Sequence, residues 1–115
     1  MHARTDALLT PAALADVEAF RLGILHVHPA ERVVEGPLGR VTIEPRAMQV
    51  LVQLGRSPDR VVTREQLFRS CWGQGWAGDD SLNGCIADVR RALKGAAGED
   101  VWIETVPRTG YKILA

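Results

Sequence analysis

The stretch from Asp79 to Ala115 places a helix pattern directly before two strand patterns, and it constrains the fold more than any other part of the chain. Apolar residues recur at helical spacing from Leu82 to Leu93, after aspartates that suit a helix N-terminus. Strand formers follow over residues 101–106 and 111–114, joined by Pro107-Arg108-Thr109-Gly110. A helix followed by a cationic hairpin can put one element in a DNA groove and the other against the adjacent phosphates.

The apolar stripe of this helix decides which residues it offers outward. With Leu82, Ile86, Val89 and Leu93 facing the core, the opposite side and the flank carry Ser81, Asn83, Gly84, Ala87, Asp88, Arg90, Arg91 and Lys94. Small polar residues near the N-terminal end suit close approach to base edges, and arginines further along suit phosphate or guanine contacts. An ordinary solvated helix would also carry a charged face, and an exposed Asp88 favours that alternative because a carboxylate repels phosphate.

The preceding residues predict the scaffold of such a domain. Strand formers at residues 24–27, 33–34 and 41–43, separated by turns, indicate a small antiparallel sheet over residues 20–44. A first helix is expected from Pro45 to Gly55, and a second from the capping box that begins at Thr63 to about Trp72. A glycine-rich loop leads to the third helix, which we expect Gly95 to end, and Gly110 is expected to permit the hairpin turn.

The expected fold class is therefore α+β. It is a winged helix-turn-helix with an N-terminal antiparallel sheet (20–44), three helices (45–95) and a C-terminal β-hairpin wing (101–115). Residues 1–19 form an N-terminal extension, which is either a short helix begun by Thr10 and Pro11 or a loosely ordered tail. The 115 residues suit a single modest core.

The composition argues against strong nucleic-acid binding by a single copy of the domain. The chain has 14 basic and 14 acidic residues, so any positive surface must come from local placement. We expect weak binding by an isolated copy and self-association on DNA. The chain has no long apolar run and its first residues lack a secretory signal, so we expect a cytoplasmic location.

Few residues indicate metal binding, cofactor binding or catalysis. Cys71 and Cys85 lack metal-ligand spacing and are expected to be small buried residues. His26 and His28 share one side of a strand without a third ligand nearby, so neither a metal nor a cofactor is expected. Hydrolase and phosphate-cradling motifs are absent, which argues against an enzyme.

The chain resembles the winged-helix effector domains of the OmpR/PhoB type over about residues 20–115. The resemblance rests on Val61-Val62-Thr63-Arg64-Glu65-Gln66-Leu67, Trp72-Gly73, Ile86-x-x-Val89-Arg90-Arg91-Ala92-Leu93 and the segment from Ile103 to Tyr111. Glu44-Pro45-Arg46 and the Val-Pro-Arg of the hairpin look more like the ToxR/CadC branch. In that branch the DNA-binding domain comes first and a membrane span follows, so this domain would be the cytoplasmic head of a membrane-anchored bacterial regulator.

The resemblance implies roles for particular residues. The third helix enters the major groove, with Ser81, Asn83 and Gly84 as base-facing candidates. Arg90 and Arg91 would contact DNA, as would Arg64 and Trp72 on the second helix, although Trp72 is equally suited to the core. The wing would contribute Arg108, Thr109 and Tyr111, and the loop that holds Trp76 matches a segment that touches RNA polymerase in some members.

The third helix also departs from the family pattern. Asp80, Ala87 and Asp88 stand where response regulators often carry basic residues, which puts direct base readout there in doubt. The alternative function is a winged-helix module that holds a protein partner through the same surface or the Trp76 loop.

Overall fold

The computed structural model describes residues 8–73 and 78–115 of the chain. A four-stranded antiparallel sheet, in the order β1-β2-β3-β4, comes first in the sequence. Its strands and the two short 3-10 helices beside it are η1 (Ala12–Asp16), β1 (Phe20–Leu22), β2 (Leu25–His28), η2 (Pro29–Glu31), β3 (Val33–Gly36) and β4 (Gly39–Thr42). The helical part and the second sheet follow as α1 (Pro45–Gly55), β5 (Val62–Thr63), α2 (Arg64–Cys71), α3 (Asp79–Ala97), β6 (Trp102–Val106) and β7 (Gly110–Leu114).

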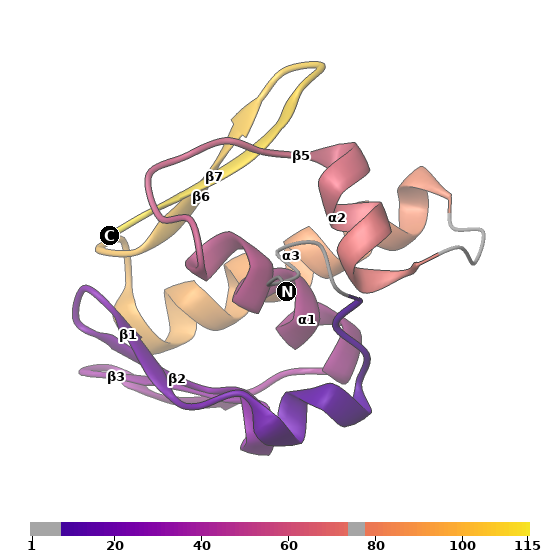
Figure 1. Ribbon diagram of the computed structural model, residues 1–115. Coiled ribbons are helices and arrows are strands. Elements are labelled where there is room, and N and C mark those ends of the chain that lie inside the picture. Colours follow the sequence, from indigo (N-terminus) through magenta and orange to yellow (C-terminus); the bar gives the residue numbers. More distant parts are fainter. Residues whose placement is uncertain (1–7, 74–77) are drawn as a thin grey trace.

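The helices lie between the two sheets. Helix α3 contacts β3 and β4 of the first sheet as well as β6 of the second, and α1 packs on α3 and β7. Figure 1 shows the first sheet on one side of the helices, with the β6–β7 hairpin projecting from the other side. Both sheets thereby bury one face, and the strands, which are too short to be stable alone, gain an apolar support.

One continuous core holds these layers together. Met48, Leu51 and Leu54 of α1 are fully buried, and Leu82 and Val89 of α3 are as well. Burying a side chain of this size contributes about 1.5–3 kcal/mol to stability. Cys71 and Cys85 are buried and form no disulfide, which confirms their predicted character.

Helix α2 begins with the predicted capping box. The Thr63 Oγ1 atom accepts from the Gln66 amide at 3.0 Å, and the Gln66 side chain accepts from the Thr63 amide at 2.8 Å. Helix α1 starts at Pro45 and ends at Gly55, as predicted. These local signals are strong because each satisfies or removes a backbone amide that a helix N-terminus leaves without a partner.

The first sheet has a strand that the sequence did not reveal. Phe20–Leu22 pairs with Leu25–His28 across a tight turn in which Gly23 has a φ of 60°. Ile24 lies in this turn, so its assignment to a strand was wrong. A glycine with a positive φ reverses the chain without steric cost, and it overrides the strand propensity of the neighbouring isoleucine.

Gly95 does not end α3, contrary to expectation. The helix continues to Ala97, and Gly98, with a φ of 66°, is its C-cap. Ala96 and Ala97 are buried in the core, so packing favours the extra turn. The small size of Gly95 serves a different purpose, because a Cβ atom there would approach Val41 to 3.1 Å.

Gly110 is also placed differently from expectation. It is the first residue of β7, and the turn residue with a positive φ is Arg108, at 64°. Strand β5, which the sequence did not predict, pairs with β7 at this point. A Cβ atom on Gly110 would lie 2.1 Å from the Val62 carbonyl oxygen, so the glycine permits close approach of β5 rather than the turn.

The N-terminal segment joins the same core. The Thr10 hydroxyl accepts from the Ala13 amide at 3.1 Å at the start of η1, and Leu9 and Leu14 are buried. This agrees with the short-helix alternative for residues 8–17. In the part of the chain that the structure describes, no helix is both long enough and apolar enough to cross a bilayer.

Candidate nucleic-acid interface

The N-terminal half of α3 offers an open face. Ser81, Asn83 and Gly84 are exposed, while Leu82, Cys85 and Ile86 are buried in the core. A Cβ atom on Gly84 would meet no other atom within 4 Å. Nothing in the described protein therefore requires glycine at this position, and an external surface can approach the backbone there closely.

Arg64 lies at the centre of a hydrogen-bonded cluster. Its Nη2 atom donates to Asp79 Oδ1 at 2.8 Å, and its Nη1 atom donates to the Tyr111 hydroxyl at 2.8 Å. A longer contact of 3.5 Å joins Nη1 to Asn83 Oδ1. The bond to Asp79 is the main cause that raises the pKa of Arg64, against the opposing effect of burial. The cluster thus ties α2 to α3 and to β7.

Tyr111 contributes to this cluster from the core. Only 6% of the residue is exposed, and its ring is part of the continuous apolar cluster. Its hydroxyl accepts from Arg64, which orients the guanidinium. The Thr109 carbonyl oxygen also accepts from the Arg64 backbone amide at 3.2 Å, so the base of the hairpin is fixed to the start of α2.

Arg90 joins α3 to the other strand of the hairpin. Its Nη2 atom donates to the Ile103 carbonyl oxygen at 3.0 Å and to Thr105 Oγ1 at 2.8 Å. These acceptors are neutral, so the positive charge of Arg90 is not cancelled by a carboxylate among the described residues. Thr105 precedes the hairpin turn by two residues, and Arg90 therefore holds the strand that leads to Arg108.

Arg91 has a different environment. Both of its terminal nitrogens donate to Asp88 Oδ1 at 3.0 Å, and its side chain is 71% exposed. An exposed pair of this kind contributes no more than about 1 kcal/mol and is readily exchanged for another partner. Asp88 thus offsets the charge of Arg91 without burying it.

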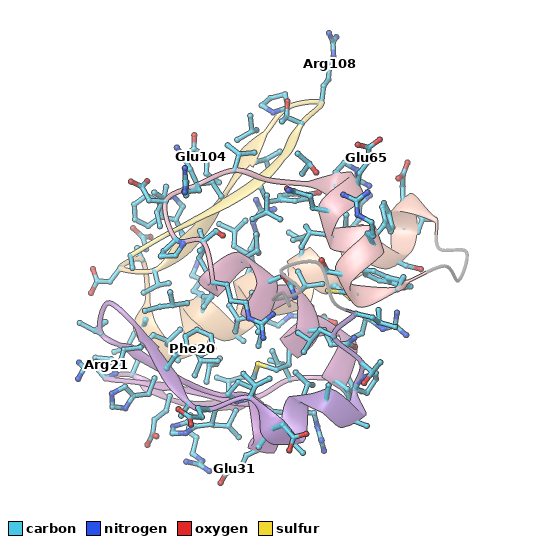
Figure 2. The ribbon with its side chains drawn as sticks, in the orientation of Figure 1. Phe20, Arg21, Glu31, Glu65, Glu104 and Arg108 are labelled. Carbon is cyan, nitrogen blue, oxygen red and sulfur yellow. The ribbon has the colours of Figure 1, made fainter. Side chains whose placement is uncertain are left out.

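The hairpin tip carries an exposed cation. Arg108 is exposed, and Figure 2 shows its side chain extending from the tip away from the domain. Thr109 closes the turn, since its amide donates to the Val106 carbonyl oxygen at 3.0 Å and its hydroxyl donates to Pro107 at 3.2 Å. Arg108 forms no ion pair with any residue in the two described ranges.

Trp72 lies at the C-terminal end of α2, partly buried against the core. The Phe68 ring packs on it at 5.4 Å, and the Arg46 guanidinium lies over its ring at 4.9 Å. Arg46 also donates to the Cys71 carbonyl oxygen at 3.1 Å, which satisfies an acceptor at the end of α2. The indole therefore packs against the core and remains partly exposed.

The structure brings the predicted residues into three groups. Arg64, Asn83 and Tyr111 meet in one cluster, Arg90 reaches the hairpin that carries Arg108 and Thr109, and Trp72 lies apart at the far end of α2. Trp76 falls outside the described residues. Sequence reasoning missed Asp79 and Thr105 as partners of the arginines, because no local pattern links residues 15 positions apart.

A helix with an open polar N-terminal face, supported by α2 and flanked by a hairpin with an exposed cation at its tip, defines a winged-helix DNA-binding domain of a transcription regulator. The chain belongs to the family described as transcriptional regulatory protein, C terminal, whose model matches residues 39–113.

Two relatives and one solved structure show which members of this family the chain resembles. It is 27% identical over 95 residues to the transcriptional activator CadC of Escherichia coli, covering 82% of this chain and 19% of that protein. It is 28% identical over 99 residues to the cholera toxin transcriptional activator of Vibrio cholerae, covering 75% of this chain and 34% of that protein. The structure of the E. coli CadC DNA-binding domain superimposes with a TM-score of 0.72 at 28% identity, covering 81% of this chain and 88% of that one.

The resemblance to the OmpR/PhoB type, and within it to CadC-like activators, is thereby confirmed, as is the winged-helix fold class. The chain spans about a fifth and a third of the length of these two relatives.

Proposed function

We propose that the domain recognises a specific double-stranded DNA sequence by inserting the N-terminal half of α3 into the major groove. The observation that carries this proposal is the polar, exposed face of Ser81, Asn83 and Gly84, where a Cβ atom on Gly84 would meet no atom of the described residues within 4 Å. Ser81 and Asn83 supply donors and acceptors that match base edges, and Gly84 lets the helix backbone approach them closely.

The phosphate contacts come from the surrounding cations. Arg90 and Arg108 carry charge that no described carboxylate cancels, so both are available to phosphates, with Arg108 on the flanking backbone or minor groove. Arg91 joins them by exchanging Asp88 for a phosphate. Thr109 adds a hydroxyl at the hairpin tip.

Arg64 and Trp72 complete the proposed contact surface, whereas Tyr111, to which the resemblance gave a contact in the wing, is 6% exposed and supports Arg64 from the core. Arg64 reaches a phosphate once it releases Asp79, and the Tyr111 hydroxyl keeps the guanidinium oriented. The indole N–H of Trp72 is a donor suited to a phosphate oxygen. Because Asp79 and Asp88 each neutralise one arginine, we expect modest affinity from one copy.

The assembly of the regulator is a further part of the proposal. Two or more copies side by side on the DNA would compensate for the neutral net charge. The Trp76 loop would contact RNA polymerase. The similarity to CadC-like activators supports a cytoplasmic domain at the head of a membrane-anchored regulator, and we assign no catalytic role to it.

A titration with labelled duplex tests the central proposal. The target sequence is first selected from random DNA, and affinity is then measured by fluorescence anisotropy across a range of salt concentrations. Arg108→Ala should weaken binding and reduce the salt slope by about 1, because one phosphate contact is lost. Arg21→Ala, a change to an exposed arginine of β1 away from the hairpin tip (Figure 2), should leave both unchanged.

Two outcomes would contradict the proposal. The first is that no sequence is enriched from the random pool. The second is that Arg90→Lys, Arg108→Ala and Arg21→Ala all bind like the unaltered domain, which would favour a module that holds a protein partner.

A further inference from the structure

A polar cleft of about 430 Å³ lies between the C-terminal half of α1, the segment that links α1 to β5, and α2. Its polar lining consists of Gln53, Ser57, Arg60, Gln66, Arg69 and Ser70. No residue of α3 or of the β6–β7 hairpin lines it. The cleft is therefore separate from the candidate nucleic-acid interface.

Helical spacing supports this separation. Arg64, Phe68 and Trp72 follow one another at intervals of four residues and mark one side of α2. Gln66 and Ser70 also lie four residues apart, about half a turn around the helix from the first set. The side of α2 that lines the cleft is thus not the side that carries the proposed phosphate contacts.

Two of the six polar side chains of the cleft, Arg60 and Arg69, are hydrogen-bond donors only, and the other four can donate as well as accept. The buried Nε2 atom of Gln53 has no hydrogen-bond partner among the described residues. Arg60 and Arg69 are exposed, and no ion pair or side-chain hydrogen bond joins either to a residue in the described ranges. Asp59 and Glu65 are close in sequence, but neither lines the cleft.

A buried donor without an acceptor destabilises the domain, and an acceptor that reaches Gln53 Nε2 from the cleft would satisfy it. Two guanidinium groups without a carboxylate between them favour an anion. The donors come from three segments, which are α1, the linking segment and α2. A phosphate group offers three acceptor oxygens to donors on different segments, whereas a carboxylate offers two.

We propose that this cleft binds a small phosphate-bearing molecule, held by Arg60 and Arg69 and by the side-chain amide of Gln53. Its volume falls in the range of sites for small organic ligands and exceeds what a single inorganic ion needs. A ligand there would bridge α1 and α2 from the side opposite the contact surface. The binding is independent of the proposed DNA contacts.

The experiment is an NMR titration of the folded domain with inorganic phosphate and pyrophosphate, each at ionic strength matched with sodium chloride. We expect saturable shifts of the backbone amides of Gln53, Ser57 and Ser70, with tighter binding of pyrophosphate. Arg69→Gln should reduce affinity about tenfold, since it removes a charged hydrogen-bond donor. Gln53→Met should reduce it by a smaller factor, and Arg21→Gln, a matched loss of an exposed arginine, should not change it.

Two kinds of result would overturn the phosphate-binding proposal. Shifts that chloride reproduces, or that persist in Arg69→Gln, would mean general screening. Equal competition by acetate or by a glutamate-rich peptide would assign the cleft to a protein carboxylate.

A duplex titration separates this proposal from the DNA-binding proposal. The double variant Arg60→Gln, Arg69→Gln should keep its duplex affinity, whereas a loss as large as that of Arg108→Ala would make the cleft part of the DNA footprint. Failure of the unaltered domain to bind any duplex would leave the phosphate result standing.

Discussion

The guanidinium of Arg64 donates to the carboxylate of Asp79 at 2.8 Å, which joins the first residue of α2 to the first residue of α3. The same arginine reaches Tyr111 on β7, so one side chain fixes the start of α3 relative to both neighbouring elements. The carboxylate that completes this arrangement also cancels a charge on the proposed contact surface. The ion pair with Asp79 thus fixes the position of Arg64 and at the same time lowers the contribution of Arg64 to DNA affinity.

Asp79→Asn should strengthen duplex binding several-fold and increase the salt slope by about 1, because Arg64 becomes available to a phosphate. The cost in stability should stay below about 1 kcal/mol, since the Asp79 side chain is 78% exposed. Anisotropy titrations at several salt concentrations measure the first effect and urea unfolding the second. Unchanged affinity with an unchanged slope would show that Arg64 is purely structural.

Tyr111→Phe keeps the buried ring and removes the acceptor of Arg64. The free energy of unfolding should fall by about 1 kcal/mol, the usual contribution of one hydrogen bond. A double-mutant cycle with Arg64→Gln measures the interaction directly. Strictly additive losses in the two single variants would rule out coupling between these side chains.

Gly84→Ala should raise the stability of the domain and weaken its binding to DNA. Alanine in a helix interior is favoured over glycine by about 1 kcal/mol, and the added methyl group meets no atom of the described protein, so the melting temperature should rise. If Gly84 faces the DNA, the same methyl group should weaken duplex binding. A variant that is more stable and binds equally well would remove Gly84 from the proposed contact surface.

Gly110→Ala should have the opposite effect on stability. The new methyl group would collide with the Val62 carbonyl and the Thr63 Cα atom, both of which are backbone groups of β5. Overpacking of this kind costs about 1–3 kcal/mol, and β5 should detach from the hairpin. Urea unfolding measures the loss, and amide exchange at Val62 and Thr63 locates it. Full protection of both amides in a stable variant would contradict the expected collision.

Burial raises the pKa of the Cys71 thiol from 9.0 to about 12. The folded state therefore holds this proton more tightly than the unfolded state, and the contribution to stability is present below pH 9 and lost as pH rises from 9 towards 12. The loss approaches about 1.4 kcal/mol per pH unit in that window. Urea unfolding from pH 8 to 10.5 should show a steeper decline than in Cys71→Ala, and parallel declines would refute the assignment.

Local sequence signals predicted the elements whose causes are local. Thr63 and Gln66 form their capping box, Pro45 starts α1, and the apolar stripe of α3 faces the core as its spacing required. The strand patterns on either side of residues 107–109 gave the hairpin, and the signature motifs gave the family. In each case the interaction lies within a few residues, so the pattern carries the information.

Tertiary structure alone decided how the helices end and which arginines are free. Gly95 lies inside α3 because Ala96 and Ala97 have a core to enter, and Gly110 is needed because β5 passes beside it. Arg64 and Arg91 have carboxylate partners, while Arg108 has none among the described residues. Such pairings depend on distances between elements that are far apart in the sequence. The sequence by itself thus determined the three helices, the hairpin and the kind of surface, whereas packing determined β1, β5 and where charge remains on that surface.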